Sequence, residues 1–309
     1  MINFYRNKTV LAITKPKIAS RLLDKVFSVT PHDDFDASKW VKSHWFSAGK
    51  TLDVEINDIG ELIIFNNSSD GRKSEHGNLD SHITKYLKNS IKELTNHINT
   101  TGDKHLSLYL FIRDPEKRFI SGLYQELYVS LSNHARFMLG ESCNDNNTLY
   151  QYTNFAKETI ETDSGLNFLK KYTNETELME GKSKPSSKRE KLFIKKIIQQ
   201  WLPWFAKTTH WVSSHTDNYL IDYLLILDYM KSSKNIKLVN IETTDARIVF
   251  EKHIESDNDI RNTSNTWLKD LLVDEIQNNS EISSSINSYL SNEMKTYQHL
   301  IKKYEDMFV

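Results

Sequence analysis

The stretch LSLYLFIRDPEKRFISGLYQE, residues 106–126, decides how the chain folds. Residues 106–112 are a short apolar run, which predicts a buried strand. The run stops at Arg113, Asp114 and Pro115, and an amphipathic helix is predicted from about 116 to 136. Pro115 suits the first helical turn, where no backbone N–H is needed, and Asp114 can cap the free amides. The stretch therefore predicts a strand that passes through a tight turn into a long helix.

The same order of elements is found ahead of this stretch. TVLAIT, residues 9–14, is typical of a buried strand, and residues 18–27 carry apolar side chains with helical spacing. Residues 51–56 and 61–67 flank a turn signal and predict a hairpin, and helical spacing returns over 81–98. Buried strands that alternate with helices predict an α/β fold with a central parallel sheet flanked by helices.

The second half of the chain is richer in helix. We expect helices over 150–172, 188–201, 266–277 and 282–306, and further strands over 223–227 and 236–242. Because neither an internal repeat nor a linker interrupts the pattern, we expect a single domain over residues 1–309.

The composition restricts the partners of the chain. The formal net charge is −1, so no overall field draws the protein to nucleic acid or to an anionic membrane. Cys143 is the only cysteine, which excludes an internal disulfide and a cysteine-based metal cluster. No run approaches the roughly 18 apolar residues of a membrane helix, and the N-terminal residues lack the features of a signal peptide. We expect a soluble cytoplasmic protein with neither a nucleic-acid nor a membrane partner.

Two strand-to-helix turns carry cations and hydroxyl groups. The carboxyl ends of parallel strands meet at one edge of a sheet, so both turns open into one crevice if the strands are neighbours. Lys17 and Ser20 lie where the amides of a helix N-terminus attract an anion. Arg113 leaves the second strand, and Arg118 and Ser121 follow on the first two helical turns. An arginine fork with a serine hydroxyl suits a phosphate, so the sequence predicts an anion site.

Both turns match motifs of a known family. PKIASRLL, residues 16–23, resembles the 5′-phosphosulfate loop of the sulfotransferases that use 3′-phosphoadenosine-5′-phosphosulfate (PAPS). RDPEKRFIS, residues 113–121, resembles the 3′-phosphate motif of that family, Arg-(Asp/Asn)-Pro-x-x-Arg-x-x-Ser, at every defined position. The interval from Lys17 to Arg113, 113 − 17 = 96 residues, is similar to that of the carbohydrate sulfotransferases. A competing register of the first loop uses Lys15, but Lys17 is preferred because the proline and serine then also match.

The resemblance implies a fold, a cosubstrate and a set of binding residues. The implied fold is a nucleotide-binding fold like that of the P-loop kinases. The implied reaction moves a sulfuryl group from PAPS to a hydroxyl of a carbohydrate or another small acceptor, without a metal ion. Lys17 is implied as the catalytic cation beside the bridging oxygen, Arg113 and Ser121 as the clamp on the 3′-phosphate, and Arg118 as a residue behind them. The implied cosubstrate-binding residues are Lys17, Ile18, Ala19, Ser20, Arg21, Arg113 and Ser121.

An acceptor hydroxyl also needs a general base, and several residues are open for this role. The loop after the second hairpin strand offers Asp70, Glu75 and His76, and the irregular stretch before the hairpin offers His32, Asp33, Asp34 and His44. We favour His76 or Glu75 as the catalytic base, because both follow a strand that is expected to end at the crevice.

Two other functions stay open. A nucleotide kinase is disfavoured, because the chain has no GxxxxGK[ST] motif. A non-catalytic protein could keep the same fold and hold a nucleotide or a glycan.

Two further segments have both a structural and a functional interpretation. The basic segment 182–191 is either a solvated loop or a contact for the cosubstrate or an anionic glycan. Residues 209–220, THWVSSHTDNYL, resemble a His-Trp-x-x-Gln segment of the carbohydrate sulfotransferases, with His215 near the position of the glutamine. The aromatic run 201–205 is expected to lie in the core, with stacking of its rings on a sugar as the alternative.

Overall fold

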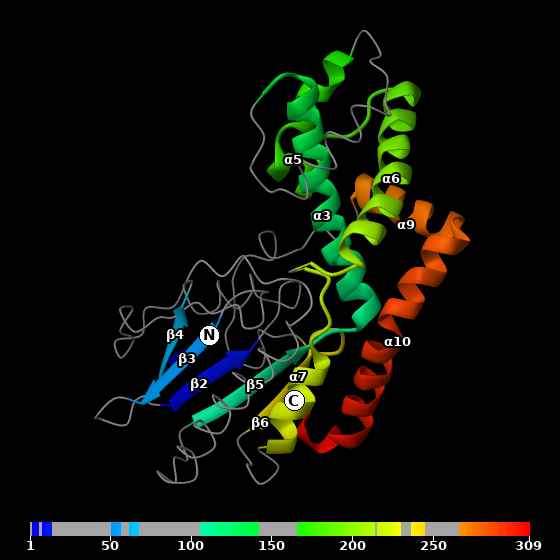
Figure 1. The fold of residues 1–309 in the computed structure, drawn as a ribbon. Coiled ribbons are helices and arrows are strands. Elements are labelled where there is room, and N and C mark those ends of the chain that lie inside the picture. Colours follow the sequence, from blue (N-terminus) through cyan, green and yellow to red (C-terminus); the bar gives the residue numbers. More distant parts are fainter. Residues whose placement is uncertain are drawn as a thin grey trace. The chain divides into compact units, whose positions relative to one another are not determined.

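The computed structural model describes residues 2–5, 8–13, 51–56, 62–67, 106–141, 166–213, 215–229, 236–244 and 266–309 (Figure 1). The chain divides into two compact units. Unit 1 contains residues Met1–Arg118, Asn218–Ile260 and Asn292–Val309, and unit 2 contains Phe119–Asp217 and Arg261–Ser291. The single-domain organisation expected from the sequence stays a prediction.

Unit 1 is built on a four-stranded sheet. Its strands, in spatial order, are β1 (Ile2–Tyr5), β2 (Lys8–Ile13), β5 (Leu106–Ile112) and β6 (Ile236–Asn240). β2 and β6 both pair with β5 in parallel, whereas β1 pairs with β2 in antiparallel orientation. The predicted strands at 9–14 and 106–112 are therefore neighbours, as the anion site requires. The antiparallel edge strand β1 was not expected from the sequence.

The interior position of β5 in the sheet explains why its sequence is a continuous apolar run. Leu110, Phe111 and Ile112 are fully buried, and β5 has a parallel partner on each side. The register places Ile13 opposite Leu110 and Ile112 opposite Asn240. The carboxyl ends of all three parallel strands therefore lie at the same edge of the sheet.

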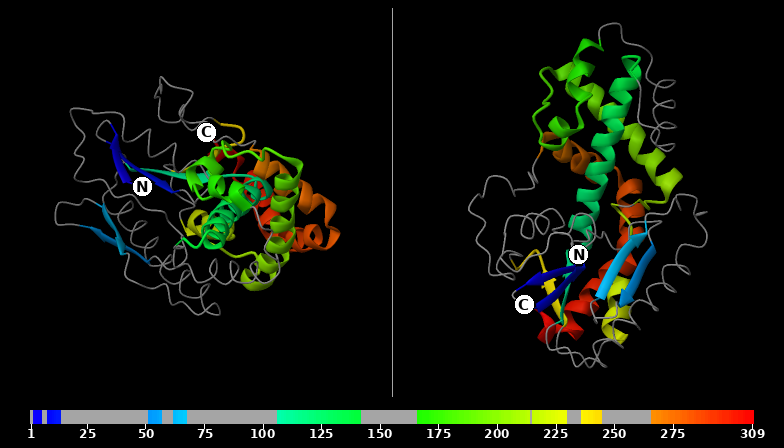
Figure 2. Two further views of the ribbon diagram at one scale, coloured as in Figure 1. Left: turned by 90° about the horizontal axis from the view of Figure 1, so that it is seen from above. Right: turned by 90° about the vertical axis from the view of Figure 1, so that its left-hand side faces the viewer.

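The predicted hairpin is present as a separate two-stranded sheet. It consists of β3 (Thr51–Ile56) and β4 (Leu62–Asn67), which pair in antiparallel register from Ile56 with Leu62 to Thr51 with Asn67. Figure 2 shows the two strands of this pair side by side and in opposite directions.

The predicted strand at 223–227 is wrong, because this apolar run belongs to helix α7 (Leu220–Tyr229). The start of α7 is stabilised by Glu293, a buried residue of helix α10 (Ser280–Lys303). Its Oε1 accepts the backbone N–H groups of Tyr219 at 2.8 Å and Leu220 at 2.9 Å. A carboxylate at a helix N-terminus satisfies free amides and favours the helix dipole. This capping group is more than 70 residues away in the sequence, so it could not be predicted from the local pattern.

The C-terminal residues complete unit 1 beside β6. The short 3-10 helix η4 (Glu305–Met307) follows α10. Phe308 then forms an isolated parallel bridge with Leu238, and the Val309 N–H donates to the Leu238 carbonyl at 3.1 Å.

Unit 2 consists of helices. It contains α3 (Pro115–Met138) from Phe119 onward, the first half of α10, and the elements η2 (Leu166–Tyr172), α5 (Glu175–Met179), α6 (Lys188–Thr209) and α9 (Trp267–Asn278). Apolar residues repeat along α3 at i, i+4 spacing and are buried: Phe119, Leu123, Leu127 and Leu131. The fully buried Trp201 donates its indole N–H to Ser130 Oγ at 3.0 Å. The predicted core role holds for Trp201, Leu202 and Phe205 of the 201–205 run, whereas Pro203 is exposed.

Several helix boundaries differ from those predicted. α6 does not end near 201 but continues through Pro203 to Thr209. The ring of Trp201, before the proline in the sequence, packs on that of Phe205, after it, at a centroid distance of 4.9 Å. Of the predicted helix 150–172, the described part is the 3-10 helix over 166–172. The predicted helices at 18–27 and 81–98 lie outside the described residues. The described residues are mostly helical and include parallel strands, which is compatible with the expected α/β class. Within the described residues, none of the helices combines the length and apolarity that crossing a bilayer demands.

Candidate anion-binding site at the ends of the parallel strands

The turn between β5 and α3 has the structure predicted for it. β5 ends at Ile112, Arg113 and Asp114 connect the two elements, and α3 begins at Pro115. Asp114 Oδ1 accepts the Lys117 backbone N–H at 3.0 Å, and the Asp114 carbonyl accepts the Arg118 N–H at 2.9 Å. Asp114 is thus the N-cap of α3, as expected from the sequence.

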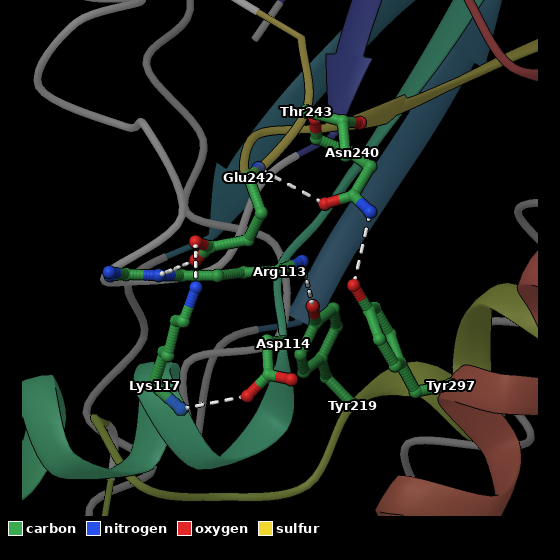
Figure 3. A network of polar contacts seen from close by, with 8 residues as sticks. All are labelled: Arg113, Asp114, Lys117, Tyr219, Asn240, Glu242, Thr243 and Tyr297. Atoms are coloured by element: carbon green, nitrogen blue, oxygen red, sulfur yellow. Dashed lines mark hydrogen bonds and ion pairs between the residues drawn. The ribbon is translucent and has the colours of Figure 1, made fainter.

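Arg113 lies at the edge where the parallel strands end. Its side chain is half-buried and forms an ion pair with Glu242, with 3.0 Å between Arg113 Nε and Glu242 Oε1. Lys117 forms a second pair with the same carboxylate, with 2.6 Å between its Nζ and Glu242 Oε2. Glu242 follows the end of β6, so residues from two neighbouring strand ends and the first turn of α3 form one cluster (Figure 3).

The charges in this cluster affect one another. Burial alone would raise the pKa of Glu242, but the hydrogen bonds from Lys117 and Arg113 outweigh burial and hold this pKa below its ordinary value. The hydrogen bond to Glu242 raises the pKa of Lys117. Glu242 and Lys117 are therefore both charged at neutral pH.

Arg118 is separated from this cluster by its burial. Its side chain is almost fully buried, and its guanidinium carbon lies 4.8 Å from the centroid of the Tyr219 ring. The Tyr219 hydroxyl accepts the Arg113 backbone N–H at 3.1 Å. Arg118 thus packs against the residue that fixes the backbone of Arg113. Stacking of an arginine on an aromatic face is a stabilising contact, which gives Arg118 a supporting position.

The turn that carries Glu242 is held by its own set of hydrogen bonds. The Asn240 side chain accepts the Glu242 N–H at 3.1 Å and donates to the Tyr297 hydroxyl at 3.0 Å (Figure 3). The Ile241 N–H donates to the Ile112 carbonyl at 3.1 Å, which ties this turn to the end of β5. The backbone on both sides of the ion pairs is therefore fixed.

The other predicted binding residues are described only in part. Ser121 lies on α3 in unit 2, and its side chain is half-buried. Its contact with a phosphate stays a prediction. The remaining predicted residues lie outside the described residues: Lys17, Ile18, Ala19, Ser20, Arg21, Glu75 and His76. Among the described residues, no histidine, cysteine or carboxylate side chains group together as a metal site would require.

Sequence reasoning did not select Lys117 and Glu242. Lys117 occupies a variable position of the Arg-Asp-Pro motif, and Glu242 is the last residue of the predicted strand 236–242. The rule that parallel strands end at one edge could have found Glu242, since the same rule placed Arg113 there.

The His-Trp segment has a structural role in unit 2. His210 ends α6 with φ of 51°, and Trp211 follows with φ of 66°. Trp211 is buried and donates its indole N–H to Ser285 Oγ at 2.9 Å. His215 Nδ1 lies 2.7 Å from Glu126 Oε1 on α3.

The basic segment 182–191 is not a single loop. It runs as a loop to Ser187, which caps α6, and from Lys188 onward it is helical. Lys182 pairs with Glu180 at 2.5 Å, and Ser183 Oγ donates to Glu177 at 3.0 Å. The lysine and arginine side chains of this segment are exposed, as a solvated segment would have them.

Comparison with known proteins found no matching family model, no matching curated protein and no matching solved structure.

Proposed function

We propose that the chain is a PAPS-dependent sulfotransferase with a nucleotide-binding fold like that of the P-loop kinases, acting on a hydroxyl of a carbohydrate or another small acceptor. One observation carries the proposal. The complete Arg-Asp-Pro-x-x-Arg-x-x-Ser motif falls on a strand-to-helix turn of parallel strands, and its first arginine lies at the edge where these strands end. Ligands of open α/β sheets bind at this edge.

The proposed reaction is an in-line displacement at sulfur. The acceptor oxygen forms a bond to sulfur while the bond from sulfur to the bridging oxygen breaks, which releases adenosine 3′,5′-bisphosphate. The acceptor proton passes to a general base, for which Glu75 and His76 are the candidates. Such transfers depend mainly on positioning and on stabilising the charge that develops on the leaving oxygen. Lys17 is the proposed cation at that oxygen.

The proposed division of labour follows the two phosphates. Lys17, Ser20, Arg21 and the backbone of Ile18 and Ala19 hold the 5′ side, and Arg113 and Ser121 hold the 3′-phosphate. The 3′-phosphate distinguishes PAPS from ATP and ADP, so Arg113 is the residue on which nucleotide selection depends. Arg118 supports it through Tyr219.

A thermal-shift comparison tests the proposal. Adenosine 3′,5′-bisphosphate, ADP and ATP are each added at the same concentration, since a ligand that binds only the folded state raises the unfolding temperature. We expect the bisphosphate to stabilise the chain far more than the other two nucleotides. At a hundred times its Kd, a ligand adds about 2.7 kcal/mol.

The Arg113→Ala variant should lose this preference. The matched control is Lys207→Ala, an exposed cation of α6 that should keep it. Equal shifts from all three nucleotides would contradict the proposal. Transfer of labelled sulfate from PAPS to a panel of carbohydrates then separates an enzyme from a binding protein, because Lys17→Ala abolishes turnover only if there is turnover to lose.

A further inference from the structure

The Glu242 carboxylate bridges two cations in the way that a bound anion would. Arg113 Nε donates to one of its oxygens at 3.0 Å, and Lys117 Nζ donates to the other at 2.6 Å (Figure 3). The two donors are therefore placed to hold the same two-oxygen anion. A phosphate presents the same kind of acceptor with three oxygens and a larger charge, so it can replace a carboxylate at these donors.

The cluster is accessible to a ligand. The Lys117 side chain is 60% exposed and that of Glu242 is 22% exposed. The Arg113 side chain is 18% exposed. The ion pair of Lys117 is weak, because water competes for its exposed ammonium group. An incoming phosphate therefore loses little free energy when it displaces the carboxylate from Lys117, and at Arg113 it exchanges one ion pair for another.

The backbone around the cluster allows the exchange without a larger rearrangement. The Glu242 N–H is held by Asn240, and the Lys117 N–H is held by Asp114. Only the torsions of the Glu242 side chain need to change for its carboxylate to move away from the two cations. Since its backbone stays in place, the carboxylate can return as soon as the ligand leaves.

We infer that Lys117 is a second cation of the phosphate site and that Glu242 is an internal carboxylate which the ligand must displace. The identity of the ligand group as the 3′-phosphate rests on the proposed function, whereas the exchange of anions at Arg113 and Lys117 does not. The exchange lowers the affinity for every anion, because binding substitutes one ion pair for another. It also helps a bound phosphate to leave, since Glu242 competes for the same donors.

The test measures the Kd of adenosine 3′,5′-bisphosphate by calorimetry for two variants. Glu242→Gln should bind about tenfold more tightly, because the competing charge is removed while the side-chain shape is kept. Lys117→Ala should bind about threefold to fivefold more weakly, as expected for one exposed cation. Opposite signs are the critical result, because a network with a purely structural role would weaken binding when broken from either end. Glu281→Gln and Lys196→Ala, both exposed, are the matched controls and should leave the Kd unchanged.

A second ligand separates this inference from the proposed function. If the unchanged protein does not bind the bisphosphate, the proposed function is overturned, and inorganic phosphate then decides the inference. Stronger phosphate binding by Glu242→Gln together with weaker binding by Lys117→Ala supports the exchange. An unchanged or weaker affinity of Glu242→Gln for both ligands overturns it.

Discussion

Replacing Tyr219 by phenylalanine removes a single hydroxyl group from beneath the candidate site. The side chain is fully buried, and its hydroxyl accepts the backbone N–H of Arg113 at 3.1 Å. The ring stacks under the Arg118 guanidinium and meets Tyr223 edge-on at a centroid distance of 5.1 Å. Phenylalanine keeps both ring contacts, so the change isolates the hydrogen bond that fixes the backbone of Arg113.

The expected effect follows from this one bond. A neutral intramolecular hydrogen bond contributes about 1 kcal/mol, and a buried donor left without an acceptor costs about 1–3 kcal/mol. Arg113 is half-buried, so water partly replaces the lost acceptor, which favours the lower figure. We expect local opening at Arg113 to become easier by about 1 kcal/mol. Because 1.4 kcal/mol corresponds to a factor of ten, the Arg113 amide should exchange roughly fivefold faster.

Hydrogen exchange of peptides that span residue 113 is the assay. The matched control is Tyr124→Phe, which removes a hydroxyl bonded to the Leu178 carbonyl at 2.8 Å in unit 2. The control should lower stability by a similar amount but leave exchange at Arg113 unchanged. If Tyr219→Phe leaves the protection of the Arg113 amide intact, the hydrogen bond does not position this residue and the reasoning fails.

Two further predictions concern unit 2. Gly122→Ala should destabilise the chain by about 1–3 kcal/mol in urea unfolding, because a Cβ at this position would lie 2.2 Å from the His215 carbonyl oxygen. A gain in stability, as is usual for Gly→Ala in a helix, would contradict this close approach. Burial alone would raise the pKa of Glu190, but hydrogen bonds from Lys171, Tyr172 and Ser186 outweigh burial and lower this pKa to about 2. Its stabilising contribution is therefore complete above pH 4.5 and is lost as the pH falls toward 2, so the urea midpoint should fall less steeply over this range in Glu190→Gln than in the unchanged chain.

The sequence predicted best where one strong local signal decides the structure. β5 has the predicted bounds, because its apolar run is ended by charged residues and a proline that begins the next helix. The strand predicted at 223–227 was wrong, because an all-apolar segment shows neither the period of a strand nor that of a helix. In the structure this segment is a helix, and the carboxylate of Glu293, from a distant part of the chain, caps its N-terminus. Helix α6 continues through Pro203, because buried residues before and after the proline keep both halves of the helix packed.

In the candidate site too, the sequence predicted the part that a strong local motif decides. Arg113 and the Asp114 cap follow from the local motif, whereas the sequence left open whether β2 and β5 are neighbours, which the structure shows. Glu242 does not follow from the local motif, since it is 129 residues from Arg113 in the sequence, although the rule that parallel strands end at one edge could have indicated it. Only the pairing of β5 with β6 brings the two side chains together. The residues just after each parallel strand are thus the set in which such partners should be sought.

The two arginines of the motif show what a sequence pattern leaves undecided. Arg113 and Arg118 are identical side chains five residues apart, and both suit a phosphate by residue type alone. The structure gives Arg113 a half-buried side chain paired with the Glu242 carboxylate, and it buries Arg118 over the ring of Tyr219. A guanidinium held at an accessible edge can change partners, whereas a buried one cannot do so without leaving its packing. The first arginine is therefore suited to bind a ligand, and the second is suited to hold the first in place.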